Sequence, residues 1–313
     1  MAEKPAKQSK SDAFNKTSAE GAPSSPTFNR TELIAQVKGI LAKNVTGNAY
    51  KIYGGEETLN PTANQKNLIK SIERSDIVFV DGPIGTGKTL WTTYVGLAGL
   101  ASGKYKRIGI SVPAVKADED VGFLPGDLGE KMYPHLKPIL DSIDDWIGKD
   151  LRMKLQDAGV IDIEAQAFMR GRTMKKTFLI LDESQNASGK QLMTTLGRIG
   201  TGSTFVFMGD NNQNDRTKTT SAYVYMINRF AVPRYMNVYS VTQKSFVGNV
   251  VLDAVDVSRH PFLQMMVKSK DHLPLVMDES KLNHLGNGTI GANSNKKNGS
   301  NGHSHAQPQQ KPS

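Results

Sequence analysis

The 313-residue chain contains no cysteine, so disulfide bonds and thiolate metal sites are excluded together. No apolar run approaches the roughly 20 residues that a membrane-spanning helix needs. The N-terminus also lacks the apolar segment of a signal peptide. The sequence therefore predicts a soluble, cytoplasmic protein without a membrane partner.

A large charge excess is also lacking in the part of the chain that can fold. The formal net charge is +9, but residues 1–30 and 268–313 together hold 11 basic and 6 acidic residues. The intervening segment keeps an excess of only four, which is a weak signal for nucleic acid because strong binders concentrate charge on one face.

The two ends of the chain are poor in apolar residues. Residues 1–30 are rich in Ser, Pro, Ala and Lys, and from about Gly286 the chain is rich in Asn, Gly, Ser, His and Gln. Such compositions do not offset the entropy of ordering. We expect a disordered tail over 1–30, an N-terminal helix and linker over 31–58, one folded domain over 59–267, and a flexible C-terminal tail over 268–313.

Short apolar runs alternate with helical patterns between the tails. Most of the runs lack polar alternation, which indicates strands covered on both faces, as in a parallel sheet flanked by helices. The pattern predicts a single α/β domain with a doubly wound parallel sheet. The expected strands are 77–81, 107–112, 177–182, 203–208 and 237–241, and the expected helices are 31–43, 88–101, 127–155, 188–199 and about 220–230.

The expected N-terminal helix has one apolar face. Its sequence, TELIAQVKGILAK, places five apolar side chains at helical spacing. Such a face packs against something, but the sequence leaves open whether that is the chain's own core or a neighbour. The residues are Leu33, Ile34, Val37, Ile40 and Leu41.

The stretch GPIGTGKT matches the phosphate-loop pattern G-x-x-x-x-G-K-[ST], directly after one expected strand and before a helix. Its glycines let backbone N–H groups converge on phosphate oxygens, and the helix adds its positive end. Lys88 would reach the β and γ phosphates, and the Thr89 hydroxyl would bind Mg²⁺. The predicted nucleotide-binding residues are Gly82, Pro83, Ile84, Gly85, Thr86, Gly87, Lys88 and Thr89.

Two acids follow the apolar run 177–181. A strand that ends in Asp182 and Glu183 would deliver both carboxylates to the edge where open α/β sheets bind ligands. We expect Asp182 to hold Mg²⁺ through water and Glu183 to deprotonate the attacking water. The second acid favours a hydrolase over a phosphate-loop kinase. The alternative is a helix N-cap followed by a solvated acid.

Two glutamines are candidates for sensing the nucleotide. Gln213, in the stretch GDNNQND, can donate to the γ phosphate or the attacking water, unless it is simply a polar turn residue. Gln65 lies just ahead of the phosphate-loop strand, where its amide could read adenine; the alternative is a helix-start glutamine on the surface. No guanine-reading Asn-Lys-x-Asp occurs, so ATP is favoured over GTP.

Longer motifs resemble the PhoH family of phosphate-starvation-inducible ATPases. They cover about 59 to 267, and GFLPGD and FMRGRT are specific to that family. The resemblance implies a RecA-like, superfamily 1 helicase-like ATPase domain, and the short core is similar to a phage-borne branch, which would place the protein in a host cytoplasm. At the start of VPAVKADE, this chain has Val112 where the family usually has an arginine. The resemblance implies that this change affects binding of a nucleic-acid strand more than ATP binding.

One nucleotide-binding domain is all that the chain has room for. Helicases of this kind hydrolyse ATP between two such domains, with an arginine from the second. A single-domain chain would borrow that arginine from another copy, and a head-to-tail contact closes into a ring. We expect a homo-hexamer, in line with the family, with Arg259 and Arg172 preferred as the finger. The other candidates are Arg170 and Arg198.

A basic segment, RGRTMKKT at 170–177, precedes the strand that ends in the two acids. It could hold a polynucleotide backbone near the ATP site, or be a solvated hairpin. Two functions therefore stay open: an Mg²⁺-dependent ATPase ring acting on RNA or single-stranded nucleic acid, and a nucleotide-gated module with slow hydrolysis that binds a protein or RNA without unwinding.

Overall fold

The computed structural model describes residues 28–113, 128–163, 173–211, 221–236 and 245–270, with the side chains of 128–132 and 270 left aside. The chain divides into two units, Met1–Lys268 and Ser269–Ser313, and the account below concerns the first. None of the helices in the described ranges is long and apolar enough to cross a membrane.

A six-stranded parallel sheet forms the centre of the first unit, with the strand order β6-β5-β7-β8-β4-β9. The β7 and β8 strands are buried along their whole length, as their uninterrupted apolar sequences predict. The strands are β4 (Ser75–Asp81), β5 (Arg107–Ser111), β6 (Ile161–Ile163), β7 (Thr177–Leu181), β8 (Thr204–Gly209) and β9 (Ser245–Val251).

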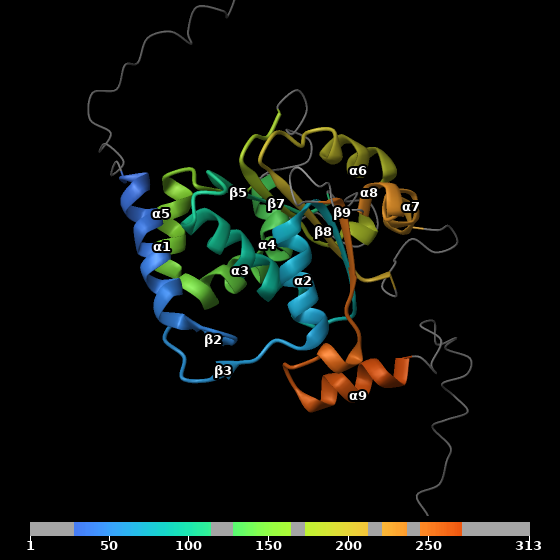
Figure 1. The fold of residues 1–313 in the computed structure, drawn as a ribbon, viewed down its shortest axis with the longest axis horizontal. Helices are drawn as coiled ribbons and strands as arrows, with labels where there is room; N and C mark the ends of the chain where they lie inside the picture. The colour runs from blue at the N-terminus through green and yellow to red at the C-terminus, as the bar shows by residue number, and fades with distance from the viewer. Residues whose placement is uncertain (1–27, 114–127, 164–172, 212–220, 237–244, 271–313) are drawn as a thin grey trace, which may run out of the picture. The chain divides into compact units, whose positions relative to one another are not determined.

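Helices cover both faces of the sheet (Figure 1), and alternate residues of the central strands β4, β7 and β8 enter different cores. Val78 and Val80 of β4 pack with α1 to α5, whereas Phe79 packs with α6 and α7. The predicted α/β fold with a parallel sheet is confirmed. The helices are α1 (Arg30–Asn44), α2 (Ala63–Arg74), α3 (Lys88–Ala101), α4 (Leu128–Ile147), α5 (Lys149–Asp157), α6 (Gly189–Leu196), α7 (Ala222–Phe230), α8 (Pro233–Met236) and α9 (Pro261–Lys270).

The α1 helix packs on the chain's own core, which answers the question that its sequence left open. Leu33, Val37 and Leu41 are buried in the same cluster as α3 and α4, and Ile34 and Ile40 pack against it. The side-chain oxygen of Asn29 accepts a hydrogen bond from Thr31 N at the start of the helix. This N-cap explains why the helix begins at Arg30.

Residues expected to be a linker form a small antiparallel sheet of β1 (Val45–Thr46), β2 (Ala49–Lys51) and β3 (Thr58–Leu59). Tyr50 anchors it, with its ring centroid 5.0 Å from those of Trp91 and Tyr94. The backbone N–H of Tyr53 donates to the carbonyl of Asp145 at 2.6 Å, which ties the small sheet to α4.

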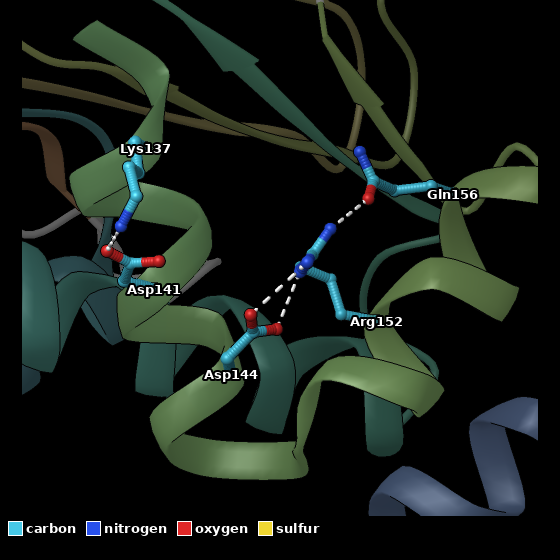
Figure 2. Close-up of polar contacts among 5 residues, drawn as sticks. All are labelled: Lys137, Asp141, Asp144, Arg152 and Gln156. Atoms are coloured by element: carbon cyan, nitrogen blue, oxygen red, sulfur yellow. Dashed lines mark hydrogen bonds and ion pairs between the residues drawn. The ribbon is translucent and has the colours of Figure 1, made fainter. Parts of the chain in front are cut away.

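The prediction of one continuous helix over 127–155 is wrong, because the segment forms two helices, α4 and α5, with a break at Gly148. This glycine has a φ of 80°, which residues with a side chain rarely adopt. A nearly buried ion pair fixes the corner (Figure 2). Arg152 of α5 donates to both carboxylate oxygens of Asp144, at 2.5 and 3.2 Å, and to Gln156.

Further elements of the described residues were not predicted, and α2 is the longest of them. The β6 strand has only three residues, and Gly248 and Asn249 interrupt the apolar sequence of β9. The η4 turn (Ala254–Asp256) and α9 follow β9. The strand predicted at 237–241 lies outside the described residues.

Candidate nucleotide-binding site

The phosphate loop connects the carboxyl end of β4 to α3. Gly85 and Gly87 have φ values of 82° and 81°, in the left-handed region that glycine adopts without steric cost. A Cβ on Gly87 would come within 3.1 Å of Trp91 and 3.2 Å of the Gln65 amide nitrogen. The loop therefore needs glycine here both for its backbone turn and for its close packing.

The Lys88 side chain lies back on the loop. Its ammonium group donates to the carbonyl oxygens of Gly82 and Pro83, the latter at 3.0 Å. Burial lowers the pKa of Lys88, while the charges of Asp182 and Asp210 act in the opposite direction. A buried cation held only by carbonyl groups and nearby acids is well suited to an incoming anion.

Thr89 and Asp182 come together across β8, which lies between β4 and β7 in the sheet. The Thr89 hydroxyl donates to an Asp182 carboxylate oxygen at 3.5 Å. Burial, with a smaller contribution from neighbouring Glu183, raises the pKa of Asp182 from 3.8 to about 6. Burial disfavours the ionised form of this carboxyl group, and a cation bound next to it would favour that form.

Glu183 has an unusual backbone conformation for a residue with a side chain, with φ 52° and ψ 35°. Its own N–H donates to an Asp182 carboxylate oxygen at 2.9 Å, and its side chain is exposed to the site. Left-handed backbone at a non-glycine residue costs free energy and is found mainly where the surrounding structure enforces it. The two adjacent carboxylates have different partners: Asp182 accepts from Thr89, and Glu183 accepts from Gln185.

Gln185 is a site residue that the sequence did not single out. It is 2% exposed, and its amide nitrogen donates to the Glu183 carboxylate at 2.7 Å. Its carbonyl oxygen accepts from the backbone N–H of Asp210 at 3.2 Å. The side chain thus joins the ends of β7 and β8, and only its place in the stretch DESQN pointed to it.

The end of β8 is also tied to β4. Asp81 accepts from Asn211 twice, from the backbone N–H at 3.0 Å and from the side-chain amide at 2.7 Å. Burial raises the pKa of Asp81, and the two hydrogen bonds from Asn211 partly offset that rise. This pair holds the strand end just ahead of residues 212–220, which lie outside the described ranges.

A cavity of about 730 Å³ opens above the loop, within the range of small-molecule sites. Its lining includes Asp182 and Glu183 and the acids Asp141 and Asp145 of α4. The small N-terminal sheet contributes further lining. Besides the loop, the lining residues that matter below are Ile52, Glu57, Leu59, Asp141, Asp145, Gln185, Asp210 and Arg259.

The site fits a nucleotide with Mg²⁺. The described residues contain no group of three or more His, Cys, Asp or Glu side chains that could hold a metal ion alone. Thr89 and Asp182 would therefore share the ion with phosphate oxygens, which is the usual arrangement for Mg²⁺.

Comparison with known proteins identifies the chain. Residues 59–269 match the family model described as "PhoH: PhoH-like protein". The chain belongs to the PhoH family. Its phosphate loop, its two acids and the end of β8 all lie inside the matched PhoH region, whereas the small N-terminal sheet lies almost entirely before it.

Two bacterial PhoH-like proteins illustrate the similarity. A PhoH-like protein of Bacillus subtilis (strain 168) is 34% identical over 231 residues, which cover 74% of this chain and 67% of that protein. One from Mycobacterium bovis is 42% identical over 160 residues, 51% of this chain and 46% of that protein. The chain thus spans about two thirds of the first and half of the second, and the expected likeness to a phage-borne branch finds no support in them.

Among solved structures, the large terminase from a thermophilic bacteriophage is similar with a TM-score of 0.44 and 9% identity. The match covers 69% of this chain and 52% of that one.

Gln65 does not have the surroundings predicted for an adenine reader. Its amide nitrogen donates to the carbonyl oxygens of Thr86 and Asp256, and its own oxygen accepts from Thr62 N. All of these partners belong to the PhoH chain itself, so no amide hydrogen remains for a base. The helix-start alternative describes the position better, although the residue is buried rather than on the surface.

The candidate arginines differ in position. Arg259 lines the cavity of its own chain. Burial and Asp141 raise the pKa of Asp145, and Arg259 partly offsets that rise. That Arg259 serves another subunit stays a prediction; within its own chain Arg259 lies at the nucleotide cavity, where it can act in its own site. Arg198 precedes β8, at the opposite edge of the sheet. Arg170, Arg172 and Gln213 lie outside the described residues.

The basic segment is described only in its second half. Lys175 and Lys176 come just before β7, at the amino edge of the sheet, whereas Asp182 follows the same strand at its carboxyl edge. A strand of this length separates them by about 17 Å. These two lysines therefore lie at the far end of β7 from Asp182, and the expected polynucleotide contact of the segment stays a prediction.

Proposed function

We propose that this PhoH-family protein binds ATP with Mg²⁺ and hydrolyses it. The observation that carries the proposal is the approach of the Thr89 hydroxyl to the Asp182 carboxylate, 3.5 Å apart, beside a glycine loop that ends in Lys88. A hydroxyl and a carboxylate at this spacing suit one divalent ion next to bound phosphates.

Each residue then has a task in phosphoryl transfer. Lys88 leaves the two loop carbonyls and pairs with the β and γ phosphates. Thr89 and Asp182 would hold Mg²⁺, and the ion would supply positive charge next to the phosphate oxygens. Glu183 accepts a proton from the attacking water, and Gln185 fixes the direction of its carboxylate. Arg259, in the same cavity, offsets charge on the leaving phosphate.

We further propose that hydrolysis is coupled to RNA or another single-stranded nucleic acid, in a homo-hexameric ring located in the cytoplasm. Membership of the PhoH family and the presence of one phosphate-loop domain support this part. The position of Arg259 in its own cavity removes one reason for a ring, so the assembly rests on the family resemblance.

The test is steady-state ATP hydrolysis with and without Mg²⁺, across a panel of RNA and single-stranded DNA, together with solution mass. We expect Mg²⁺-dependent hydrolysis that RNA or single-stranded DNA accelerates. Lys88→Ala should lose nucleotide binding, and Glu183→Gln should bind ATP without hydrolysing it. An active Glu183→Gln protein would overturn the assignment of the base. A rate that no polymer changes would favour the nucleotide-gated module.

A further inference from the structure

The start of α2 is built around Gln65. Thr62 and Gln65 form a capping box: Thr62 Oγ1 accepts from Gln65 N at 3.2 Å, and Gln65 Oε1 accepts from Thr62 N at 2.9 Å. A capping box satisfies backbone N–H groups at a helix start. It occupies only the oxygen of the Gln65 side chain, so the amide nitrogen is available for another purpose.

That nitrogen joins two segments that are far apart in the sequence. It donates to the carbonyl oxygen of Thr86 at 3.0 Å, inside the phosphate loop, and to that of Asp256 at 3.1 Å, at the end of η4. Gln65 is 2% exposed. Breaking two buried hydrogen bonds leaves carbonyl groups without partners, which is costly.

The second segment is held firmly to α2. Asp256 is fully buried, and its carboxylate accepts from the Thr62 hydroxyl and from Asn64 Nδ2, the latter at 3.0 Å. It also accepts from the backbone N–H of Asp253 at 2.8 Å. Only three residues later, Arg259 lines the nucleotide cavity.

The segment after η4 also packs against the phosphate loop. A Cβ added to Gly85 would lie 3.4 Å from the Val257 side chain and 3.6 Å from that of Leu263. The loop that would hold the phosphates and the segment that carries Arg259 are therefore in contact, and one buried amide is hydrogen-bonded to both.

We propose that Gln65 is a positioning residue that keeps the phosphate loop and Arg259 in register on either side of the bound triphosphate. The inference rests on the proposed function and extends it to a residue whose side-chain amide is hydrogen-bonded to groups of the chain itself. A positioning role predicts that Gln65 acts on the phosphates through the loop. An adenine reader would instead act on the base alone.

The first experiment compares ligands that share the triphosphate but differ in the base. Binding of ATP, GTP and inorganic tripolyphosphate is measured for wild type, Gln65→Met and Gln191→Met. Gln191 occupies the corresponding capping-box position on α6, where its side-chain oxygen accepts from Ser188 N at 2.7 Å. Gln65→Met should weaken the binding of all three ligands by a common factor of roughly ten. Gln191→Met should leave the three affinities unchanged. Loss of ATP binding with unchanged tripolyphosphate binding would overturn the proposal.

The second experiment asks whether Gln65 acts through Arg259. The values of kcat are measured for Gln65→Glu, Arg259→Ala and the double variant. Gln65→Glu keeps one side-chain oxygen for the capping box but turns the other toward the carbonyl oxygens of Thr86 and Asp256. It therefore keeps the cap and removes the bridge, by which we mean the two hydrogen bonds from the Gln65 amide to these carbonyl groups. We expect the double variant to be little slower than Arg259→Ala, because the bridge has nothing left to position. Fully multiplicative effects would contradict the proposal.

Folding and the parent function are checked separately. Each variant is melted, and if either Gln65 variant fails to fold, Asn64→Ala takes its place: it removes one bond to Asp256 and should give a smaller loss in the same direction. No loss there would count against the bridge. If wild type binds no triphosphate, or Lys88→Ala binds it normally, the proposed function itself fails. If wild type binds triphosphate normally and Gln65→Met binds it equally well, only the inference about Gln65 fails.

Discussion

The side-chain amide of Gln185 donates to the carboxylate of Glu183 at 2.7 Å, while the amide oxygen accepts from the Asp210 backbone N–H at 3.2 Å. One buried side chain thereby links the expected general base to the end of the neighbouring strand. Glu183 has a strained backbone and an otherwise exposed side chain, so this hydrogen bond is what fixes its direction.

Replacing Gln185 by Leu should lower kcat for ATP about tenfold, with little change in KM, because ATP binding does not need the bond and proton abstraction does. Gln185→Glu places a second negative charge beside Glu183. The two carboxylates repel each other and the hydrogen bond is lost, so kcat should fall in this variant as well. Stopped hydrolysis assays between about pH 5 and 9 measure both effects; an unchanged kcat in Gln185→Leu would contradict the role.

Arg259→Ala should slow hydrolysis severely, and mixing it with Lys88→Ala subunits should restore nothing. The reason is that Arg259 lines the cavity of its own chain, so each subunit needs its own copy. The check is the ATPase rate of mixtures at several ratios, compared with unmixed variants. Recovery at intermediate ratios would show that the arginine acts on a neighbour.

Asp182→Asn should make the nucleotide-free protein more stable at pH 8. The pKa of Asp182 is raised from 3.8 to about 6, so its proton stabilises the fold below about pH 4, and this contribution is lost as the pH rises through 6. Removing the charge should contribute on the order of 1 kcal/mol after allowing for solvent screening, a rise in Tm of about 2–4 °C.

Thermal melts in EDTA at pH 4 and pH 8 test this prediction. The gain should vanish at pH 4, where wild type is itself protonated. A variant that is less stable than wild type at pH 8 would show that Asp182 is not under electrostatic strain.

The two ion pairs of Figure 2 should differ greatly in importance. Arg152 and Asp144 have side-chain exposures of 9% and 22%, whereas Lys137 and Asp141 have 57% and 56%. Arg152→Met should cost about 2–4 kcal/mol, because it leaves Asp144 without its partner in a partly buried place. Lys137→Met should cause no resolvable change. Urea unfolding of both variants measures the difference; equal midpoints would refute it.

Much of the sheet was predictable because its signals are local. The apolar runs that became β4, β5, β7 and β8 are continuous, and the boundaries of α3 were predicted correctly because a glycine loop precedes it. The strands that escaped prediction are short or interrupted: β6, β9 and the small N-terminal sheet gain their stability from neighbours that the sequence does not display.

The site was predictable as far as single motifs reach. Residues 82–89 and the two acids follow strands that the pattern identified. The ambiguity at Gln65 has a physical origin: a glutamine three residues after Thr62 fits both a capping box and a base reader, and only the tertiary partners Thr86 and Asp256 favour the first. Gln185 was missed because nothing in its sequence context separates a structural amide from a surface one.

The β1–β3 sheet has a practical consequence for where this protein can be trimmed. The family match begins at residue 59, yet Ile52 and Glu57 line the nucleotide cavity and Tyr50 packs on Trp91. A shortened protein that starts at the family boundary would lose one side of its cavity and uncover an aromatic cluster. Fragments for assays or crystals should therefore begin before α1.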